Sequence, residues 1–274
     1  MKIMITGGHG RLGKAFADYL REEEVYSFHR YQLDCTDRNA VMKQVDKLNP
    51  DLIFHCAAFT NVDECESQPM KSFLVNCVAV QYMAEAAGGR PLFLFSTDYL
   101  FSKFSLEPYS EMDQPTPDNM YALSKWLAEE GVRHHSNVYV IRTSWLFGGE
   151  NDFIEKIRTA ANLKSELKVV SDQVGSPTYI RDLVEWTWLL RHYSPGLYHI
   201  SNRGACSRFE WAQAILSYLP RQVNLVSTKT EKRVGQASRP TRTVLSTTKL
   251  EQTLLMKPRR WQEALGEYMQ EKHT

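Results

Sequence analysis

Tyr121 and Lys125 lie four positions apart in the segment NMYALSKW (119–126), which the sequence predicts to be helical. Side chains at positions i and i+4 share one face of a helix, so a phenol and an ammonium group would lie side by side. A nearby positive charge favours phenolate over phenol, and we therefore expect the pKa of Tyr121 to fall from its usual value of about 10. Such a tyrosine can act as a general acid or base. The alternative is a half-buried tyrosine beside a surface lysine.

A second group of polar residues follows a predicted strand. The apolar run PLFLFS (91–96) leads directly into Thr97, Asp98 and Tyr99. A hydroxyl group at Thr97 can donate to a substrate carbonyl while a tyrosine protonates it. The alternative is that the Thr97 hydroxyl only bonds the backbone of its own turn.

The segment IMITGGHGRLG (3–13) is rich in glycine and lies between a predicted strand and a predicted helix. Glycines there allow a tight turn and a close approach to a pyrophosphate, whose charge meets the free amides of the helix N-terminus. The alternative is a glycine-rich turn without a ligand. The segment predicts a dinucleotide site whose residues include Gly7, Gly10, Arg11, Leu12 and Gly13.

The end of the second predicted strand bears on the choice of dinucleotide. An NAD-selective site usually has an acidic residue there, whereas VYSFHR ends in His29 and Arg30. A cationic side chain suits a 2′-phosphate, so we expect NADPH, with NADH possible; the alternative is that Arg30 faces solvent. Asp34 could contact the adenine or cap the next helix. The remaining predicted cofactor-binding residues are Cys35, Ala57 and Ala58.

The first half of the chain alternates short apolar runs with amphipathic ones. This alternation favours parallel strands joined by crossover helices, in a doubly wound α/β sheet of the Rossmann type. In such a sheet the carboxyl ends of the strands carry the site. The predicted strands span 2–6, 25–28, 52–57, 91–96 and 138–144, and the predicted helices span 11–22, 38–48, 70–87 and 119–134.

After Gly148 and Gly149 the predicted elements become shorter. We expect an NAD(P)-binding domain over 1–148 and a smaller, interleaved C-terminal lobe over 149–274, which binds substrate and sends segments back to the main sheet. The polar stretch 227–243 is the best candidate for a mobile loop. Helices are predicted near 151–162, from 207 and over 260–271, and strands over 167–172, 196–201 and 222–226.

Composition excludes several classes of protein. Lys and Arg number 33 against 32 Asp and Glu, and no basic patch follows a nucleic-acid backbone, so we expect no nucleic-acid partner. No apolar run approaches the roughly 20 residues of a membrane span, and the N-terminal apolar stretch is too short for a signal peptide, which favours a cytoplasmic protein without membrane contact. Five cysteines without CxxC spacing favour reduced thiols, and the eight histidines form no metal-ligand pattern, so we expect no metal.

The sequence resembles the extended short-chain dehydrogenase/reductase family and, within it, the dTDP-4-dehydrorhamnose reductases. The glycine segment and YxxxK mark only the superfamily, whereas STDYLF, RTSW and DQxGxPT are more specific to the reductase branch. The matching motifs span nearly the whole chain: GGHGRLG (7–13), AAFTNVDECE (57–66), Asn76, STDYLF (96–101), PYSEMDQPTPDNMYALSK (108–125), RTSWLFG (142–148), SDQVGSPT (171–178), GLYHIS (196–201) and SRP (238–240).

The resemblance implies NADPH-dependent reduction of the C4 ketone of dTDP-4-dehydro-β-L-rhamnose to dTDP-L-rhamnose, the last step of dTDP-rhamnose synthesis. Tyr121 would donate the proton, Lys125 would bind the nicotinamide ribose and lower the tyrosine pKa, and Thr97 would orient the carbonyl. Residues that match positions facing the sugar nucleotide are Asp98, Tyr99, Trp145 and, as a clamp for the diphosphate, Arg239.

Alternatives for two of these residues stay open: Trp145 could fill the core and Arg239 could be an ordinary surface arginine. The chain also departs from the family where Ser102 and Lys103 replace a common Asp-Gly pair, which leaves the sugar open. Some relatives bind magnesium at a dimer contact through a glutamate just after the glycine segment. Lys14 stands there in this chain, so no metal is expected and either a monomer or a homodimer is compatible.

Other functions share this fold and are weighed by the same motifs. A nucleotide-sugar 4,6-dehydratase needs an acidic residue directly after the Thr-Asp pair, and this chain has Tyr99 there. An epimerase would keep NAD bound and has no need of a cation after the second strand. The remaining alternatives are a reductase or epimerase of another nucleotide-4-keto-deoxysugar and a non-catalytic nucleotide-binding regulatory subunit, since the reductase branch resembles the regulatory partner of methionine adenosyltransferase.

Overall fold

The computed structural model describes residues 1–231 and 235–271, so part of the predicted loop 227–243 and the last three residues of the predicted C-terminal lobe lie outside the described residues. The first half contains β1 (Lys2–Thr6), α1 (Arg11–Tyr19), β2 (Glu24–Phe28), α2 (Arg38–Leu48), β3 (Leu52–His55), α3 (Val62–Ser67), α4 (Pro69–Phe73), α5 (Ala79–Ala87), β4 (Leu92–Thr97), α6 (Met120–Val132) and β5 (Val138–Thr143). The second half contains β6 (Leu146–Phe147), α7 (Phe153–Leu163), β7 (Glu166–Val170), β8 (Val174–Gly175), β9 (Thr178–Tyr179), α8 (Ile180–Leu190), β10 (Gly196–His199), β11 (Cys206–Ser207), α9 (Arg208–Leu216), β12 (Asn224–Thr228), α10 (Thr248–Leu254) and α11 (Trp261–Glu271).

The large sheet has six strands in the order β10-β5-β4-β3-β1-β2, and every neighbouring pair is parallel. The chain moves from β1 outward to β2 and then crosses back to place β3 on the other side of β1. The strand order therefore reverses between β1 and β3, which is where ligands bind in open α/β sheets. The predicted doubly wound parallel sheet is confirmed.

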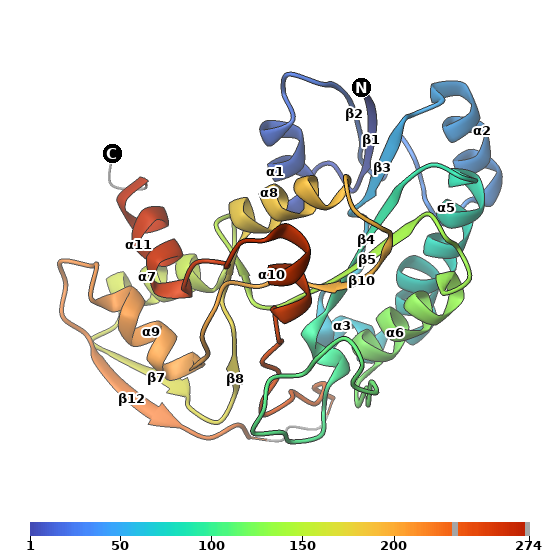
Figure 1. The fold of residues 1–274 in the computed structure, drawn as a ribbon. Coiled ribbons are helices and arrows are strands. Elements are labelled where there is room, and N and C mark those ends of the chain that lie inside the picture. Colours follow the sequence, from blue (N-terminus) through green and yellow to red (C-terminus); the bar gives the residue numbers. More distant parts are fainter. Residues whose placement is uncertain (232–234, 272–274) are drawn as a thin grey trace.

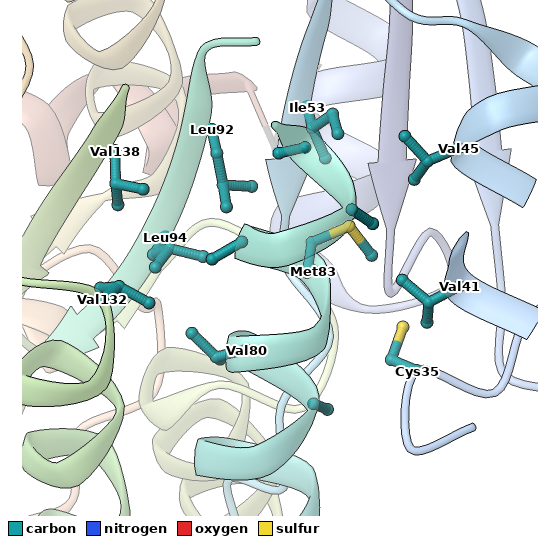
Figure 2. Close-up of a cluster of buried hydrophobic side chains, with 14 of the residues drawn as sticks. Cys35, Val41, Val45, Ile53, Val80, Met83, Leu92, Leu94, Val132 and Val138 are labelled. Carbon is teal, nitrogen blue, oxygen red and sulfur yellow. The ribbon is translucent and has the colours of Figure 1, made fainter. Parts of the chain in front are cut away.

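Helices cover both faces of this sheet because successive strand residues point to opposite sides. On one face, Met4 and Ile53 pack with residues of α2, α5 and α6. Figure 2 shows Val80 and Met83 of α5 in this cluster, beside Leu92 and the neighbouring strands. On the other face, α1 and α8 cover the alternate strand residues, with Phe16 of α1 fully buried.

The C-terminal lobe packs around its own buried cluster, which contains Trp211 and Trp261. In Figure 1 this lobe, with α7, α9, α11 and the parallel pair β7 and β12, lies to one side of the large sheet. Two of its later segments return to the large sheet: β10 pairs with β5, and α8 packs against α1. The interleaving is confirmed, whereas the division after residue 148 stays a prediction. The helix α10 was not predicted from the sequence.

The predicted helix 70–87 contains a π-helical turn at Leu74–Val78, between α4 and α5. Buried Asn76 lies in this turn; its amide donates to the carbonyl of Phe59 (2.9 Å) and the hydroxyl of Ser124 (3.0 Å), and its oxygen accepts from the amide of Phe59 (2.7 Å). A π-helical turn accommodates one extra residue, and such turns occur often at functional sites. The prediction of one regular helix was therefore wrong at this point. None of the helices described here has the length and apolarity needed to cross a membrane.

Candidate active site

A cleft of about 290 Å³ lies at the carboxyl ends of β1, β2 and β3, where the strand order reverses. We call it the switch-point cleft. Among the residues predicted to bind cofactor, it is lined by Gly7, Gly10, Arg30, Asp34, Cys35, Ala57 and Ala58. His9, His29 and Lys71 also line it, so several basic side chains surround the cleft.

Three residues of the glycine segment do not line the switch-point cleft. Arg11 donates to the carbonyl of Leu146 (3.2 Å), and Leu12 packs between two apolar clusters. Gly13 lies behind the loop, where an added Cβ would come within 2.4 Å of the Gly7 carbonyl oxygen. The missing side chain of Gly13 therefore allows close packing of α1 against the loop.

The loop before α1 fits a pyrophosphate. Gly7 has a φ of +68°, and an added Cβ would lie 2.6 Å from the amide nitrogen of Ala57. The helix α1 starts after Gly10, which provides no side-chain cap. The first amides of an α-helix have no partner within the helix, and an anion is the natural acceptor for them.

Two roles were predicted for Asp34, and one of them, capping of the next helix, is not observed. Its carboxylate accepts from the amide (2.9 Å) and the hydroxyl (2.7 Å) of Thr36, and this hydroxyl bond lowers the pKa of Asp34. The N-cap of α2 is Asp37, which accepts from the amide of Ala40. Asp34 thus stabilises the turn before α2 and does not cap the helix, because the helix starts later than that alternative requires.

Thr97, at the end of β4, meets the first turn of α6. Tyr121 lies in that turn, which starts at the N-cap Asn119. The Thr97 side chain acts on the phenol of Tyr121 and lowers its pKa. The ring of Tyr99 meets the Tyr121 ring edge-on, with centroids 6.1 Å apart. The strand end thus brings a hydroxyl group and two phenols together.

The predicted fall in the pKa of Tyr121 was wrong. Burial of the phenol raises its pKa above 10, and this effect outweighs the interaction with the Thr97 side chain, which lowers it. Burial also lowers the pKa of Lys125 to about 8, while the nearby carboxylate of Glu129 opposes that fall. A raised pKa keeps Tyr121 protonated, which is the form that a general acid requires.

Asp98 lies directly behind these residues and is only 2% exposed. Its carboxylate accepts from the hydroxyls of Thr97 (3.3 Å) and Thr243. Burial raises the pKa of Asp98 to about 6, and the charge of Arg208 partly opposes the rise. The two hydroxyl bonds hold Asp98 against the turn, so it supports Thr97.

Arg208 is a charged residue of this site that the sequence reasoning missed. Its guanidinium group lies 3.5 Å from the centre of the Trp145 ring, and its charge acts on Tyr99 and Asp98. Trp145 also stacks on Trp211, with ring centroids 5.6 Å apart, so it both fills the core and faces a cation. The S-x-x-E capping box at 207–210 signals the start of α9, but it does not show which distant element the first residue meets.

Arg239, in the segment between β12 and α10, lies at the same site. It forms an ion pair with Asp63 at 3.0 Å and donates to the carbonyl of Ala237. Its positive charge also acts on Tyr99. The structure therefore places Arg239 beside the predicted sugar-facing residues.

The described residues contain no group of three or more His, Cys, Asp or Glu side chains that could hold a metal ion. All five cysteines are unpaired.

Comparison with known proteins adds to this geometry. The family model described as RmlD substrate binding domain matches residues 1–274. The chain is 37% identical over 279 residues to the spore coat polysaccharide biosynthesis protein SpsK of Bacillus subtilis, covering 100% of this chain and 98% of that protein. It is 35% identical to a dTDP-4-dehydrorhamnose reductase of Mycolicibacterium smegmatis, covering 96% and 84%, and 32% identical to a dTDP-4-keto-6-deoxy-D-glucose reductase of Streptomyces niveus, covering 96% and 94%.

A solved structure shows the same arrangement over the whole chain. The dTDP-4-dehydrorhamnose reductase of Bacillus anthracis, in complex with NADP, superimposes with a TM-score of 0.95 at 35% identity, covering 99% of this chain and 100% of that one. The match of the family model to the full chain and the identity to these relatives show that the chain belongs to the dTDP-4-dehydrorhamnose reductase family of extended short-chain dehydrogenases/reductases.

Proposed function

We propose that the chain reduces the C4 ketone of dTDP-4-dehydro-β-L-rhamnose to dTDP-L-rhamnose, with NADPH as the cofactor and NADH as a possible substitute. The observation that carries the proposal is the meeting of Thr97 and Tyr121 at the end of β4, with Lys125 on the next turn of α6. Lys125 also acts on Cys56, which lines the switch-point cleft. The family membership of the chain supports the same reaction.

The residues around the switch-point cleft fit NADPH. NADPH supplies a hydride to the ketone carbon. The uncapped amides at the start of α1, which include those of Arg11, Leu12 and Gly13, bind the pyrophosphate, and Gly7 and Gly10 let the backbone approach it. Arg30 lines the cleft after β2 and pairs with the 2′-phosphate, while Asp34, Cys35, Ala57 and Ala58 form the wall on the adenosine side.

Residues at the end of β4 and on α6 carry out the proton transfer. Tyr121 donates its proton to the ketone oxygen, and burial favours the protonated phenol before the reaction. Thr97 donates to the same oxygen and so orients the carbonyl. Lys125, one helical turn from Tyr121, binds the nicotinamide ribose and stabilises the phenolate that proton transfer leaves.

The sugar nucleotide contacts residues from both parts of the chain. Asp98 and Tyr99 follow the strand that holds Thr97, and Trp145 follows β5. Arg239 binds the diphosphate with its guanidinium fork, exchanging or sharing its contact with Asp63. We place the enzyme in the cytoplasm as a monomer or a homodimer.

A second candidate is a reductase that takes the unepimerised ketone. This candidate is supported by the similarity to the Streptomyces niveus protein, which is named dTDP-4-keto-6-deoxy-D-glucose reductase. Both candidates use the same three catalytic residues. They differ only in the stereochemistry of the sugar that Tyr99 and Trp145 face.

One assay separates these candidates. Oxidation of NADPH is followed by absorbance with dTDP-4-dehydro-6-deoxyglucose as substrate, in the presence and absence of a 3,5-epimerase. Oxidation that requires the epimerase, with dTDP-rhamnose as product, supports the proposal. Oxidation without the epimerase supports the second candidate, and no oxidation by folded protein with either NADPH or NADH contradicts both.

A further inference from the structure

Two histidines from different elements lie ring against ring at the switch-point cleft. His9 belongs to the loop before α1, and His29 follows β2. Their ring centroids are 4.2 Å apart, and the ring planes are tilted by 36°. Both residues line the cleft. The proposed function gives a role to neither of them.

The backbone brings these two rings together. The amide of Gly8 donates to the carbonyl of Phe28 at 2.9 Å, which ties the loop before α1 to the end of β2. Gly8 allows this approach because an added Cβ would collide with Oγ of Ser27. The next residue of each segment is a histidine, so the close contact of the two backbones places His9 beside His29.

One atom of the pair has no hydrogen-bond partner among the described residues. This atom is Nδ1 of His29, which is shielded from solvent. The side chain of Gln32 contacts the backbone amide of His29 (3.2 Å) and leaves the ring free. Buried polar atoms are almost always paired with protein, ordered water or a ligand, so an unpaired ring nitrogen beside a ligand cleft points to a partner from the ligand.

The charges around the two rings favour an anionic ligand. Arg30 and Lys71 line the same cleft and bring positive charge to it. Asp34 is the carboxylate among the described residues of the lining, and it accepts from the amide (2.9 Å) and the hydroxyl (2.7 Å) of Thr36. A protonated imidazole at this cleft therefore finds its acceptor in the ligand.

The position of His29 indicates which part of the cofactor it meets. In dinucleotide-binding sheets the pyrophosphate lies at the N-terminus of the first helix, and the residue that follows the second strand meets the 2′ position of the ribose. His29 stands directly after β2, and Arg30 comes next. NADPH carries a phosphate at the 2′ position, whereas NADH carries a hydroxyl. The stacked rings thus lie where the two cofactors differ.

We propose that His9 and His29 together bind the 2′-phosphate of NADPH beside Arg30 and take up a proton when they do so, which makes the preference for NADPH over NADH depend on pH. The inference rests on the NADPH-binding part of the proposed function. Two positive rings in contact repel each other, so an anion is needed before both can be protonated together. A phosphate dianion supplies that charge and several acceptor oxygens. The proton comes from solvent, and no covalent bond forms or breaks.

The other titratable groups at the cleft do not give the same pH dependence. Imidazole is the side chain that ordinarily changes its charge between pH 5 and 8, whereas arginine, lysine and tyrosine, including Tyr31 at 6.0 Å from the His29 ring, titrate outside this range. Burial raises the pKa of the Cys35 thiol to about 11 and also raises that of Cys56. Hydrogen bonding within its own turn lowers the pKa of Asp34. The phosphate itself is largely a dianion above pH 7, since its second pKa is about 6.

Isothermal titration calorimetry measures the proton uptake directly. Binding of NADPH and of NADH is measured at pH 7.5 in two buffers with different ionisation enthalpies, and the difference in observed enthalpy gives the number of protons taken up. We expect uptake with NADPH and none with NADH. Because uptake of one whole proton changes affinity tenfold per pH unit, the dissociation constant for NADPH should rise roughly threefold to tenfold between pH 7.0 and 8.0. Equal uptake with the two cofactors would overturn the proposal.

Substitution of the two rings assigns the uptake to them. His9→Gln and His29→Gln keep a polar side chain and remove the titrating group. Each should reduce the proton uptake with NADPH, and the double variant should abolish it and weaken NADPH binding roughly tenfold at pH 7.0, with NADH binding unchanged. His134→Gln, at an exposed histidine just after α6 that does not line the cleft, is the matched control and should behave as the wild type. Proton uptake that persists in the double variant would contradict the assignment.

A third variant separates fixed charge from titrating charge. Arg30→Gln should weaken NADPH binding by a similar factor at every pH between 7.0 and 8.0, because it leaves the two imidazoles in place. Its proton uptake should therefore match that of the wild type. Loss of the uptake in this variant, with both histidines intact, would count against the pair as the group that gains the proton.

These measurements separate the inference from the proposed function because they need no turnover. A protein that takes up protons with NADPH but reduces no sugar nucleotide would refute the reduction and keep the role of the two histidines. An active reductase with the same uptake for NADPH and NADH would refute the histidine pair alone. A folded protein that binds no NADPH would refute both.

Discussion

The buried carboxyl group of Asp98 makes folding stability depend on pH in a predictable way. Its side chain is 2% exposed, and its pKa rises from 3.8 to about 6 because burial disfavours the charged form. Asp98→Asn keeps the size of the side chain and removes its ionisation. The difference in unfolding free energy between the wild type and this variant therefore isolates the titration of Asp98.

The magnitude follows from the two pKa values. A rise from 3.8 to about 6 corresponds to about 3 kcal/mol, at 1.36 kcal/mol for each tenfold change in proton affinity. The folded state binds the proton more tightly than the unfolded state. The stabilisation from protonated Asp98 is therefore complete below pH 3.8 and is lost as the pH rises through about 6.

Urea unfolding of both proteins at pH 4.5 and pH 7.5 measures this change. The stability of the wild type relative to Asp98→Asn should fall by about 2 kcal/mol between these two values, because part of the titration lies below pH 4.5. Other titrating groups, such as Glu111, are common to both proteins and cancel in the difference. A difference that does not change with pH would refute the assignment of Asp98 as a carboxyl group protonated at mildly acid pH.

Three further predictions concern the reaction, the cofactor and the loop. Tyr121→Phe should lower turnover by ~10²–10⁴-fold with unchanged NADPH binding. The control variant Tyr31→Phe, at a side chain that is 97% exposed, should keep full activity. A fully active Tyr121→Phe variant would contradict the mechanism. Arg30→Asp should shift the ratio of dissociation constants from NADPH towards NADH, and an unchanged ratio would show that Arg30 does not contact the phosphate. Gly13→Ala, whose Cβ would lie 2.4 Å from a backbone oxygen, should lower the free energy of unfolding by about 1–3 kcal/mol. The control variant Gly89→Ala, whose Cβ would have nothing within 4 Å, should keep a free energy of unfolding within about 1 kcal/mol of the wild type. Equal melting temperatures in the two variants would argue against the close contact at Gly13.

The features that the sequence predicted correctly depend on neighbouring residues. The glycine segment between β1 and α1 and the alternation of apolar and amphipathic runs are local patterns, and they were sufficient to predict the sheet and its switch-point cleft. The i and i+4 spacing likewise placed Tyr121 and Lys125 on one face of α6.

The features that were missed depend on residues far apart in the chain. The pKa of Tyr121 was predicted in the wrong direction because burial of the phenol, which the helix spacing does not reveal, raises it. Arg208 was overlooked because its partner Trp145 belongs to another element, and no short motif joins the two. The π-helical turn at Asn76 has the same origin, since its hydrogen bonds reach Phe59 and Ser124.

The pairing of β10 with β5 has a consequence for the order in which the protein is made. Residues 196–199 form an edge strand of the large sheet, and α8, just before them, covers α1. A growing chain that has emerged only to residue 148 therefore exposes one edge of β5 and the apolar face above α1. The large sheet therefore receives its last strand only after residue 199 has been translated, so the first 148 residues cannot complete this sheet by themselves.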